Sequence, residues 1–180
     1  MSKLNRTKEE IVKKARELGK TYEGRYKGCG QSTFLAIVDA LRWGGLEILP
    51  EDVVNRVYPG ICFLTAGTNM TGEGTCGAVS SSVMAIGIAM GVPLGSTDTK
   101  DQKAIASVIT KDILNRYYQK YGSILCKDVQ RKHFGKAWDL TSEEMTREFL
   151  SITDGCTIME TAGWATKCIL NEFEKGNVRP

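Results

Sequence analysis

Hydrophobic residues recur every three or four positions along most of the chain, which is the spacing of one face of an α-helix. In the first such stretch, Ile11, Ala15 and Leu18 follow a capping box at residues 7–10, and Gly19 stands as a stop signal. Similar start and stop signals bound the later stretches. They predict helices over about 7–19, 29–43, 50–58, 76–90, 100–121 and 142–151, and a last helix from 154.

No stretch alternates hydrophobic and polar residues as a strand would. We therefore expect an all-α fold, a compact bundle of about six or seven helices. The helix over 76–90 carries a narrow stripe of small residues that would let another backbone approach, so we expect it to be central. The stripe consists of Ala78, Ser81, Ser82, Ala85 and Ala89. The glycine-rich stretch 60–75 is expected to be an ordered, functional loop that leads into this helix.

The 180 residues, 42% hydrophobic and 25% charged, are enough to bury a core as one domain over 1–180. The net charge of +3 is nearly balanced and the basic residues are scattered, which argues against a nucleic-acid partner. The most hydrophobic stretch, 83–94, is too short to cross a bilayer, and residues 1–10 lack the apolar segment of a signal peptide. These features predict a cytoplasmic protein with no membrane insertion.

Six cysteines carry the candidate chemistry, because thiols in a reducing compartment bind metal, do redox chemistry or lie in the core. Four of them fall at or near the start of an expected helix: Cys29, Cys76, Cys126 and Cys156. Ser123 is the expected N-cap that puts Cys126 in a first turn, and Asp154 does the same for Cys156. A helix N-terminus favours thiolate over thiol, so four such cysteines match the ligand set of an iron–sulfur cluster or a structural zinc.

The spacing leaves other interpretations open, because there is no CxxC pair and each of these cysteines is equally well explained as a small core residue. Cys62 lies in the apolar run "ICFL" and is expected in the core, as is Trp164. Cys168 follows Cys156 by twelve residues on one helix, at an angle that keeps the two side chains in different sites. His133, the one histidine, stands in a basic segment and is expected to be exposed or to face a partner.

The chain resembles the C_GCAxxG_C_C family of redox-active proteins over about residues 8–172. The resemblance rests on "GCGQS" at 28–32, "GTCGAVSSSVMAIGIAMG" at 74–91, "YGSILCKDV" at 121–129 and "DGCTIMETAGWA" at 154–165. Members are small helical proteins with four characteristic cysteines, which correspond by motif to Cys29, Cys76, Cys126 and Cys156. The chain departs from the family at Ser81, where a glycine is usual. It also departs in "AGTNMTGEG", which has fewer glycines than the glycine-rich run that precedes the second cysteine in the family.

The resemblance implies that these four cysteines hold an iron–sulfur cluster, with [2Fe–2S] favoured over [4Fe–4S] and zinc as the alternative metal. The family is also similar to the C-terminal iron–sulfur part of split-Soret cytochromes, but the chain has no CxxCH, so no covalent haem is expected. Glycines beside the first two cysteines would let backbone N–H groups approach the sulfurs. They are Gly28, Gly30, Gly74 and Gly77.

Three function classes remain open. The first is an electron-transfer or reductive protein that uses the cluster. The second is a metal-free protein in which a pair such as Cys29 and Cys76 cycles through a disulfide, and the third is a structural zinc domain for protein interaction. No phosphate loop, dinucleotide fingerprint or Ser-His-Asp set indicates another class of enzyme. The expected partner is a redox protein, and a second subunit that covers the centre would make a homo-oligomer.

Overall fold

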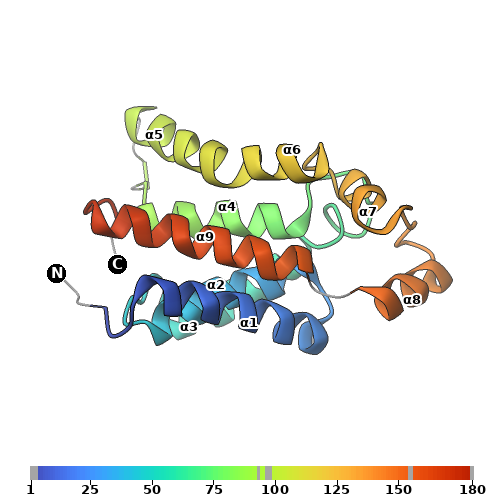
Figure 1. Cartoon of the computed structure of the whole chain (residues 1–180), viewed down its shortest axis with the longest axis horizontal. Helices are drawn as coiled ribbons and strands as arrows, with labels where there is room; N and C mark the ends of the chain where they lie inside the picture. Colours follow the sequence, from blue (N-terminus) through green and yellow to red (C-terminus); the bar gives the residue numbers. More distant parts are fainter. Residues whose placement is uncertain (1–3, 93, 96–98, 154–155, 179–180) are drawn as a thin grey trace.

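The computed structural model describes residues 4–92, 94–95, 99–153 and 156–178, and this part of the chain is all-helical, as expected (Figure 1). It contains eight helices when the continuous run Thr99–Tyr121 is taken as one, against the six or seven expected. In order they are α1 (Lys8–Tyr26), α2 (Cys29–Trp43), α3 (Glu51–Cys62), α4 (Gly77–Met90), α5 (Thr99–Ile109) with the π-helical turn η1 (Thr110–Leu114) and α6 (Asn115–Tyr121), α7 (Cys126–Phe134), α8 (Glu143–Ile152) and α9 (Cys156–Glu174).

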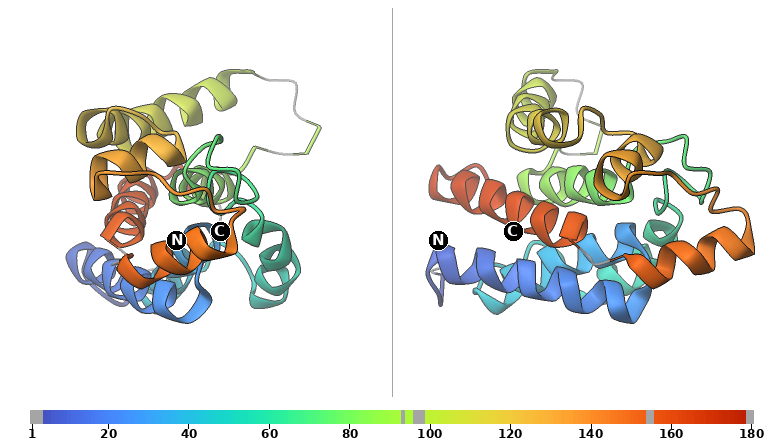
Figure 2. Two further views of the ribbon diagram at one scale, coloured as in Figure 1. Left: turned by 90° about the vertical axis from the view of Figure 1, so that its right-hand side faces the viewer. Right: turned by 45° about the vertical axis from the view of Figure 1, so that its right-hand side comes forward.

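Four helices, α1, α2, α4 and α9, pack against one another in the middle of the molecule. Helix α3 lies against α2, and the run from α5 to α6 lies across α4 and α9 (Figures 1 and 2). Helices α2, α4 and α9 all begin at the same end of the bundle, beside α7 and α8 (Figure 1). Three helix dipoles therefore turn their positive ends toward this end of the molecule.

The hydrophobic side chains of these helices form one large core. The small-residue stripe of α4 is buried in it, as expected for a central helix, with Ala78, Ser81 and Ala85 fully enclosed. The α5–α6 run turns its expected face to the same core, and that face consists of Ile105, Ile109, Ile113 and Tyr117. The run ends at Gly122, which adopts a left-handed φ of 74°.

Helix α1 does not end at Gly19, as its sequence predicted, but continues to Tyr26. Gly19 is buried inside the helix, where an added Cβ would lie 3.0 Å from Cα and 3.2 Å from N of Met159 on α9. The glycine allows α1 to pack closely on α9 and does not terminate the helix. The chain leaves the helix at Lys27, whose φ of 54° is left-handed.

Helix α3 also runs past its predicted end, because Pro59 lies inside it and the helix continues to Cys62. Proline has no N–H, so the helix loses one hydrogen bond at this position. The additional turn buries Ile61 in the core with 2% of its surface exposed, which offsets that loss. The loop that was expected over 60–75 therefore begins at residue 63.

The predicted helix caps near the third cysteine differ in detail from the structure. Leu125, not Ser123, is the N-cap of α7, and the Ser123 hydroxyl instead accepts a hydrogen bond from the Leu125 N–H at 3.1 Å. Cys126 is nonetheless the first residue of α7. Ser142 caps α8 through its hydroxyl, so this helix begins one residue later than expected. Asp154, the expected cap of α9, lies outside the described residues.

Two glycines of α1 provide a test of the α1–α9 contact. Gly19→Ala is expected to destabilise the protein by about 1–2 kcal/mol, because the new methyl group meets backbone atoms of Met159 that cannot move aside. Gly24→Ala, in the same helix, meets no atom within 4 Å and is expected to stabilise the protein by about 0.5–1 kcal/mol. Urea unfolding of both variants measures the difference, and equal effects would contradict the close packing.

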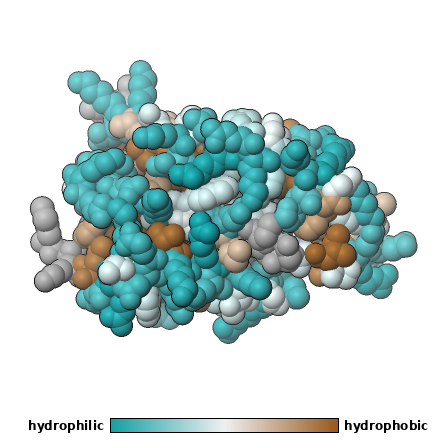
Figure 3. Space-filling model, in the orientation of Figure 1, coloured by the Kyte–Doolittle hydropathy of each residue, from teal (hydrophilic) through white to brown (hydrophobic). Residues whose placement is uncertain are grey.

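The face of the molecule shown in Figure 3 is mainly hydrophilic and carries only small, separate hydrophobic patches. Helix α8 carries two exposed hydrophobic residues, Leu150 at 36% and Ile152 at 44%. Within the described residues, no helix combines the length and the apolar character needed to cross a bilayer.

Candidate functional site

Two of the predicted cysteines meet where α2 and α4 begin. Cys29 is the first residue of α2, and Cys76 is the N-cap of α4. Gly77 allows this approach, because a Cβ there would lie 2.6 Å from the Cys29 Sγ and 2.8 Å from the Leu64 carbonyl oxygen. The Cys76 thiol hydrogen-bonds to the Cys29 sulfur, and both cysteines are free of disulfides.

The segment after α3 surrounds Cys29 with hydrogen-bonding groups. The Thr65 Oγ1 lies 3.3 Å from the Cys29 Sγ and accepts a hydrogen bond from the Gly30 N–H at 3.2 Å. The backbone N–H groups of Ala66 and Gly77 also donate to the Cys29 sulfur. N–H donors of this kind stabilise a thiolate over a thiol.

The turn that supplies the Ala66 N–H has an unusual backbone. All five residues from Ala66 to Met70 have positive φ values between 51° and 68°, and only Gly67 among them is a glycine. Left-handed conformations cost L-residues about 1–2 kcal/mol each, so strong local contacts must hold this turn. One such contact is the close packing of Gly67 on Cys126. A Cβ at residue 67 would lie 2.7 Å from the Cβ of Cys126.

A single β-bridge brings the third cysteine to the first two. Thr75 and Leu125 form an isolated antiparallel bridge, although no strand is present in the described part of the chain. The Cys76 N–H donates to the Ile124 carbonyl at 2.8 Å, and the Cys126 N–H donates to the Gly74 carbonyl at 2.9 Å. The bridge therefore fixes the start of α7 beside the start of α4.

Buried polar side chains complete the surroundings of Cys76 and Cys126. The Gln130 Nε2 donates to the Cys126 Sγ at 3.3 Å, while its Oε1 accepts from the Trp138 backbone N–H at 2.9 Å, which fixes the orientation of the amide. The Tyr117 hydroxyl lies 3.9 Å from the Cys76 Sγ and 2.6 Å from the Thr161 Oγ1. Helices α5–α6, α7 and α9 thus all contribute polar contacts to the cysteine site.

The three cysteines differ in their affinity for protons. The hydrogen bond from Cys76, with further donors, lowers the pKa of Cys29 from 9.0 to about 6 against the opposing effect of burial. The same hydrogen bond, together with burial, raises the pKa of Cys76 well above its ordinary value. Burial and the nearby charge of Cys29 raise the pKa of Cys126 to about 12, against the hydrogen bond from Gln130. At neutral pH the site therefore holds one thiolate, Cys29, beside two thiols.

The fourth predicted cysteine, Cys156, is the first residue of α9, and α9 begins at the same end of the bundle (Figure 1). Its side chain lies outside the described part of the structure. Among the described side chains, no group of three or more histidine, cysteine, aspartate or glutamate residues is arranged to hold a metal ion. The three thiols and the N–H donors around Cys29 are nevertheless groups of the kind that ligate and surround an iron–sulfur centre.

All four cysteines lie within a stretch that matches a known family. Residues 27–167 match the family described as "Putative redox-active protein (C_GCAxxG_C_C)". The chain belongs to this family. No curated protein and no solved structure gives a significant match to the chain.

The two other cysteines of this C_GCAxxG_C_C protein have different surroundings. Cys168 is buried in the main core with 1% of its surface exposed. Cys62, expected in the core, is instead half-buried beside Tyr58 at the end of α3. His133 is half-buried and contacts the rings of Tyr121 and Phe134. Trp164, expected in the core, is partly buried and packs against it.

Sequence patterns did not reveal Thr65, Gln130 and Tyr117 as neighbours of the cysteines in this C_GCAxxG_C_C protein. Tyr117 was expected only as a residue on the core face of its helix, and Thr65 had no distinguishing pattern. One signal did exist for Gln130, which lies four residues after Cys126 and therefore on the same helix face.

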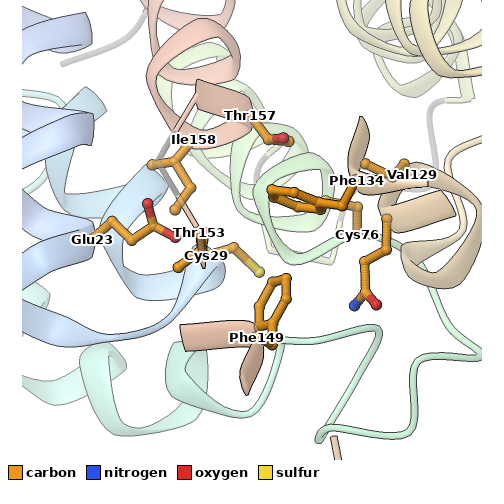
Figure 4. A pocket seen from close by; sticks show the side chains of 10 residues that line it. Glu23, Cys29, Cys76, Val129, Phe134, Phe149, Thr153, Thr157 and Ile158 are labelled. Atoms are coloured by element: carbon orange, nitrogen blue, oxygen red, sulfur yellow. Dashed lines mark hydrogen bonds between the residues drawn. The ribbon is translucent and has the colours of Figure 1, made fainter. Parts of the chain in front are cut away.

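A pocket with a cavity volume of about 60 Å³ opens beside the two paired cysteines. Its wall includes Cys29, Cys76, Phe134 and Phe149, and Figure 4 shows the two rings and the Cys29 side chain converging on the same space. In this C_GCAxxG_C_C protein, the paired cysteines therefore line a pocket whose wall also includes Phe149 of α8.

Proposed function

We propose that the protein transfers electrons, or reduces a substrate, with a [2Fe–2S] cluster held by Cys29, Cys76, Cys126 and Cys156. The main support is the convergence of Cys29, Cys76 and Cys126 on helix starts at the end of the bundle where α9 also begins. Membership of a redox-active family supports the same function. When bound, the cluster supplies one-electron chemistry.

The protein's own groups have defined parts in this proposal. Cys29 is already ionised at neutral pH, whereas Cys76 and Cys126 must lose their protons to become ligands. The N–H groups of Ala66 and Gly77 and the amide of Gln130 donate to sulfur, which favours a more negative charge at the centre. A redox protein is the expected partner.

The contact between Cys29 and Cys76 favours a second candidate, a metal-free thiol–disulfide function. The Cys29 thiolate would attack a substrate disulfide, form a mixed disulfide and release the first substrate thiolate. Cys76, after losing its proton, would attack the Cys29 sulfur and release the second. The substrate gains two electrons as a dithiol, and the protein loses two as a Cys29–Cys76 disulfide.

Anaerobic purification distinguishes these functions. Under the cluster proposal, the wild-type protein is brown and contains about two irons and two acid-labile sulfides per chain. Cys76→Ser is expected to lose at least about nine-tenths of the iron, since a serine hydroxyl replaces a thiolate ligand. Cys62→Ser, a control in a half-buried cysteine outside the site, is expected to retain it.

The second candidate predicts a different set of results. A colourless protein that remains free of iron after anaerobic reconstitution, yet forms a Cys29–Cys76 disulfide when oxidised, would overturn the cluster proposal in favour of thiol chemistry. One tightly bound zinc per chain with no colour would instead support a structural metal domain.

A further inference from the structure

A second pocket, with a cavity volume of about 110 Å³, adjoins the first at Cys29. The two pockets share four wall residues: Glu23, Cys29, Gln130 and Phe149. The half-buried Cys29 side chain therefore stands between them. A molecule in the second pocket would lie directly against the redox site.

The walls of this second pocket are mainly apolar. The apolar wall residues are Ala66, Met70, Leu140, Phe149 and Leu150. The left-handed turn supplies Ala66 and Met70, and α8 supplies Phe149 and Leu150. The polar groups of Thr65, Thr146 and Gln130 in the wall already make hydrogen bonds within the protein. An apolar ligand would therefore leave few unpaired polar groups in this wall.

Helix α8, which forms part of the wall of the second pocket, is loosely packed on the rest of the protein. Helix α8 has no fully buried residue, and its Phe149 ring packs against the rings of Phe134 and Trp138 at centroid distances of 5.8 and 5.3 Å. The Phe149 ring belongs to this wall, and a flat ligand can stack on it.

The charged side chains at the mouth of the second pocket indicate which polar group a ligand would carry there. Lys27 is exposed there, and a neighbouring cavity that shares Glu23, Lys27 and Leu150 adds Lys20. The Glu23 carboxylate accepts a hydrogen bond from the Thr153 hydroxyl at 2.7 Å. Among the described residues, the ammonium groups of Lys20 and Lys27 accompany the Glu23 carboxylate, which favours an anionic group at the mouth.

We propose that the second pocket binds a small, flat, apolar molecule with one anionic group, its ring between Met70 and Phe149 and its charge near Lys27. This inference does not depend on the iron–sulfur cluster. The position beside Cys29 makes such a molecule a suitable substrate or electron acceptor for either redox function. Binding is therefore to be measured on the protein as purified anaerobically, with its iron content recorded separately.

Calorimetric titration with 2-naphthoate tests the site, with the uncharged 2-naphthamide as the matched probe. We expect saturable binding of one 2-naphthoate per chain and about fivefold weaker binding of the amide. Lys27→Asn is expected to weaken only 2-naphthoate, again by about fivefold, because asparagine tolerates the left-handed backbone at this position. Phe149→Ala is expected to weaken both probes about tenfold.

Two further variants keep the test independent of folding. Met70→Gly removes a wall side chain at a φ of 68° that glycine adopts readily, so it is expected to weaken both probes without loss of stability. Met145→Ala changes an exposed residue of α8 outside the pocket and is expected to leave both affinities unchanged. Absence of saturable binding, or equal affinities in wild type, Phe149→Ala and Met70→Gly, would overturn the proposal.

Discussion

Gly77→Ala is expected to destabilise the protein by about 3 kcal/mol and to abolish the redox site, because no space exists for a methyl group between the starts of α2 and α4. The added Cβ would lie 2.6 Å from the Cys29 Sγ, 2.8 Å from the Leu64 carbonyl oxygen and 3.0 Å from the Gly30 nitrogen. Two of these atoms belong to the backbone, so relief requires movement of α2 or of the segment before the left-handed turn. Urea unfolding and the iron content of anaerobically purified protein measure the two effects.

Gly87→Ala is the matched control for this substitution. It lies in the same helix, α4, and an added Cβ meets no atom within 4 Å. We expect a gain in stability of about 0.5–1 kcal/mol, as for an ordinary helix interior, and no change in iron content. A Gly77→Ala protein as stable as the wild type would show that the two helix starts are not held in close contact.

Alkylation of Cys29 in metal-free protein is expected to reach half of its maximal rate near pH 6, because its pKa is lowered from 9.0 to about 6. The thiolate is the reactive form, so the rate falls only as the pH drops through the pKa of the folded protein. Cys76 and Cys126, whose pKa values are raised, are expected to remain unmodified at pH 7. Mass spectrometry of iodoacetamide-treated protein, resolved by peptide, measures each site.

Variants of Cys76 identify the cause of this low pKa. Cys76→Ala removes the strongest hydrogen-bond donor to the Cys29 sulfur, so the midpoint is expected to move toward 9. Cys76→Ser retains a donor of similar size and is expected to keep the midpoint below that of the alanine variant. An unchanged midpoint in Cys76→Ala would mean that the Thr65 hydroxyl and the N–H groups of Ala66 and Gly77 are sufficient to stabilise the thiolate.

The helical class could be predicted from sequence because hydrophobic spacing and caps are local signals. Predictions failed where a distant contact decided the outcome. Gly19 carries the usual stop signal, but the close approach of α9 makes it an interior residue of α1. Pro59 carries another, but the burial of Ile61 continues α3 past it. Such effects depend on residues far away in the chain and leave no local pattern.

The candidate site was predicted in part. The position of cysteines at helix starts indicated Cys29, Cys76 and Cys126 as a group, and the three lie close enough to shift one another's pKa. The contribution of Thr65 was not predictable, because it depends on a left-handed turn of mostly non-glycine residues, for which sequence offers no signal. The metal-ligand role of the four cysteines remains a prediction that the iron measurement tests.

The bridge between Thr75 and Leu125 has a consequence for the order of folding. It joins residues 50 positions apart, and the contact of Cys29 with Thr65 spans 36 positions. Helices form within about a microsecond, whereas contacts of this range must first overcome the entropy of closing long loops. The cysteine site is therefore expected to form after the individual helices. Substitutions within it are expected to accelerate unfolding and to leave the refolding rate nearly unchanged.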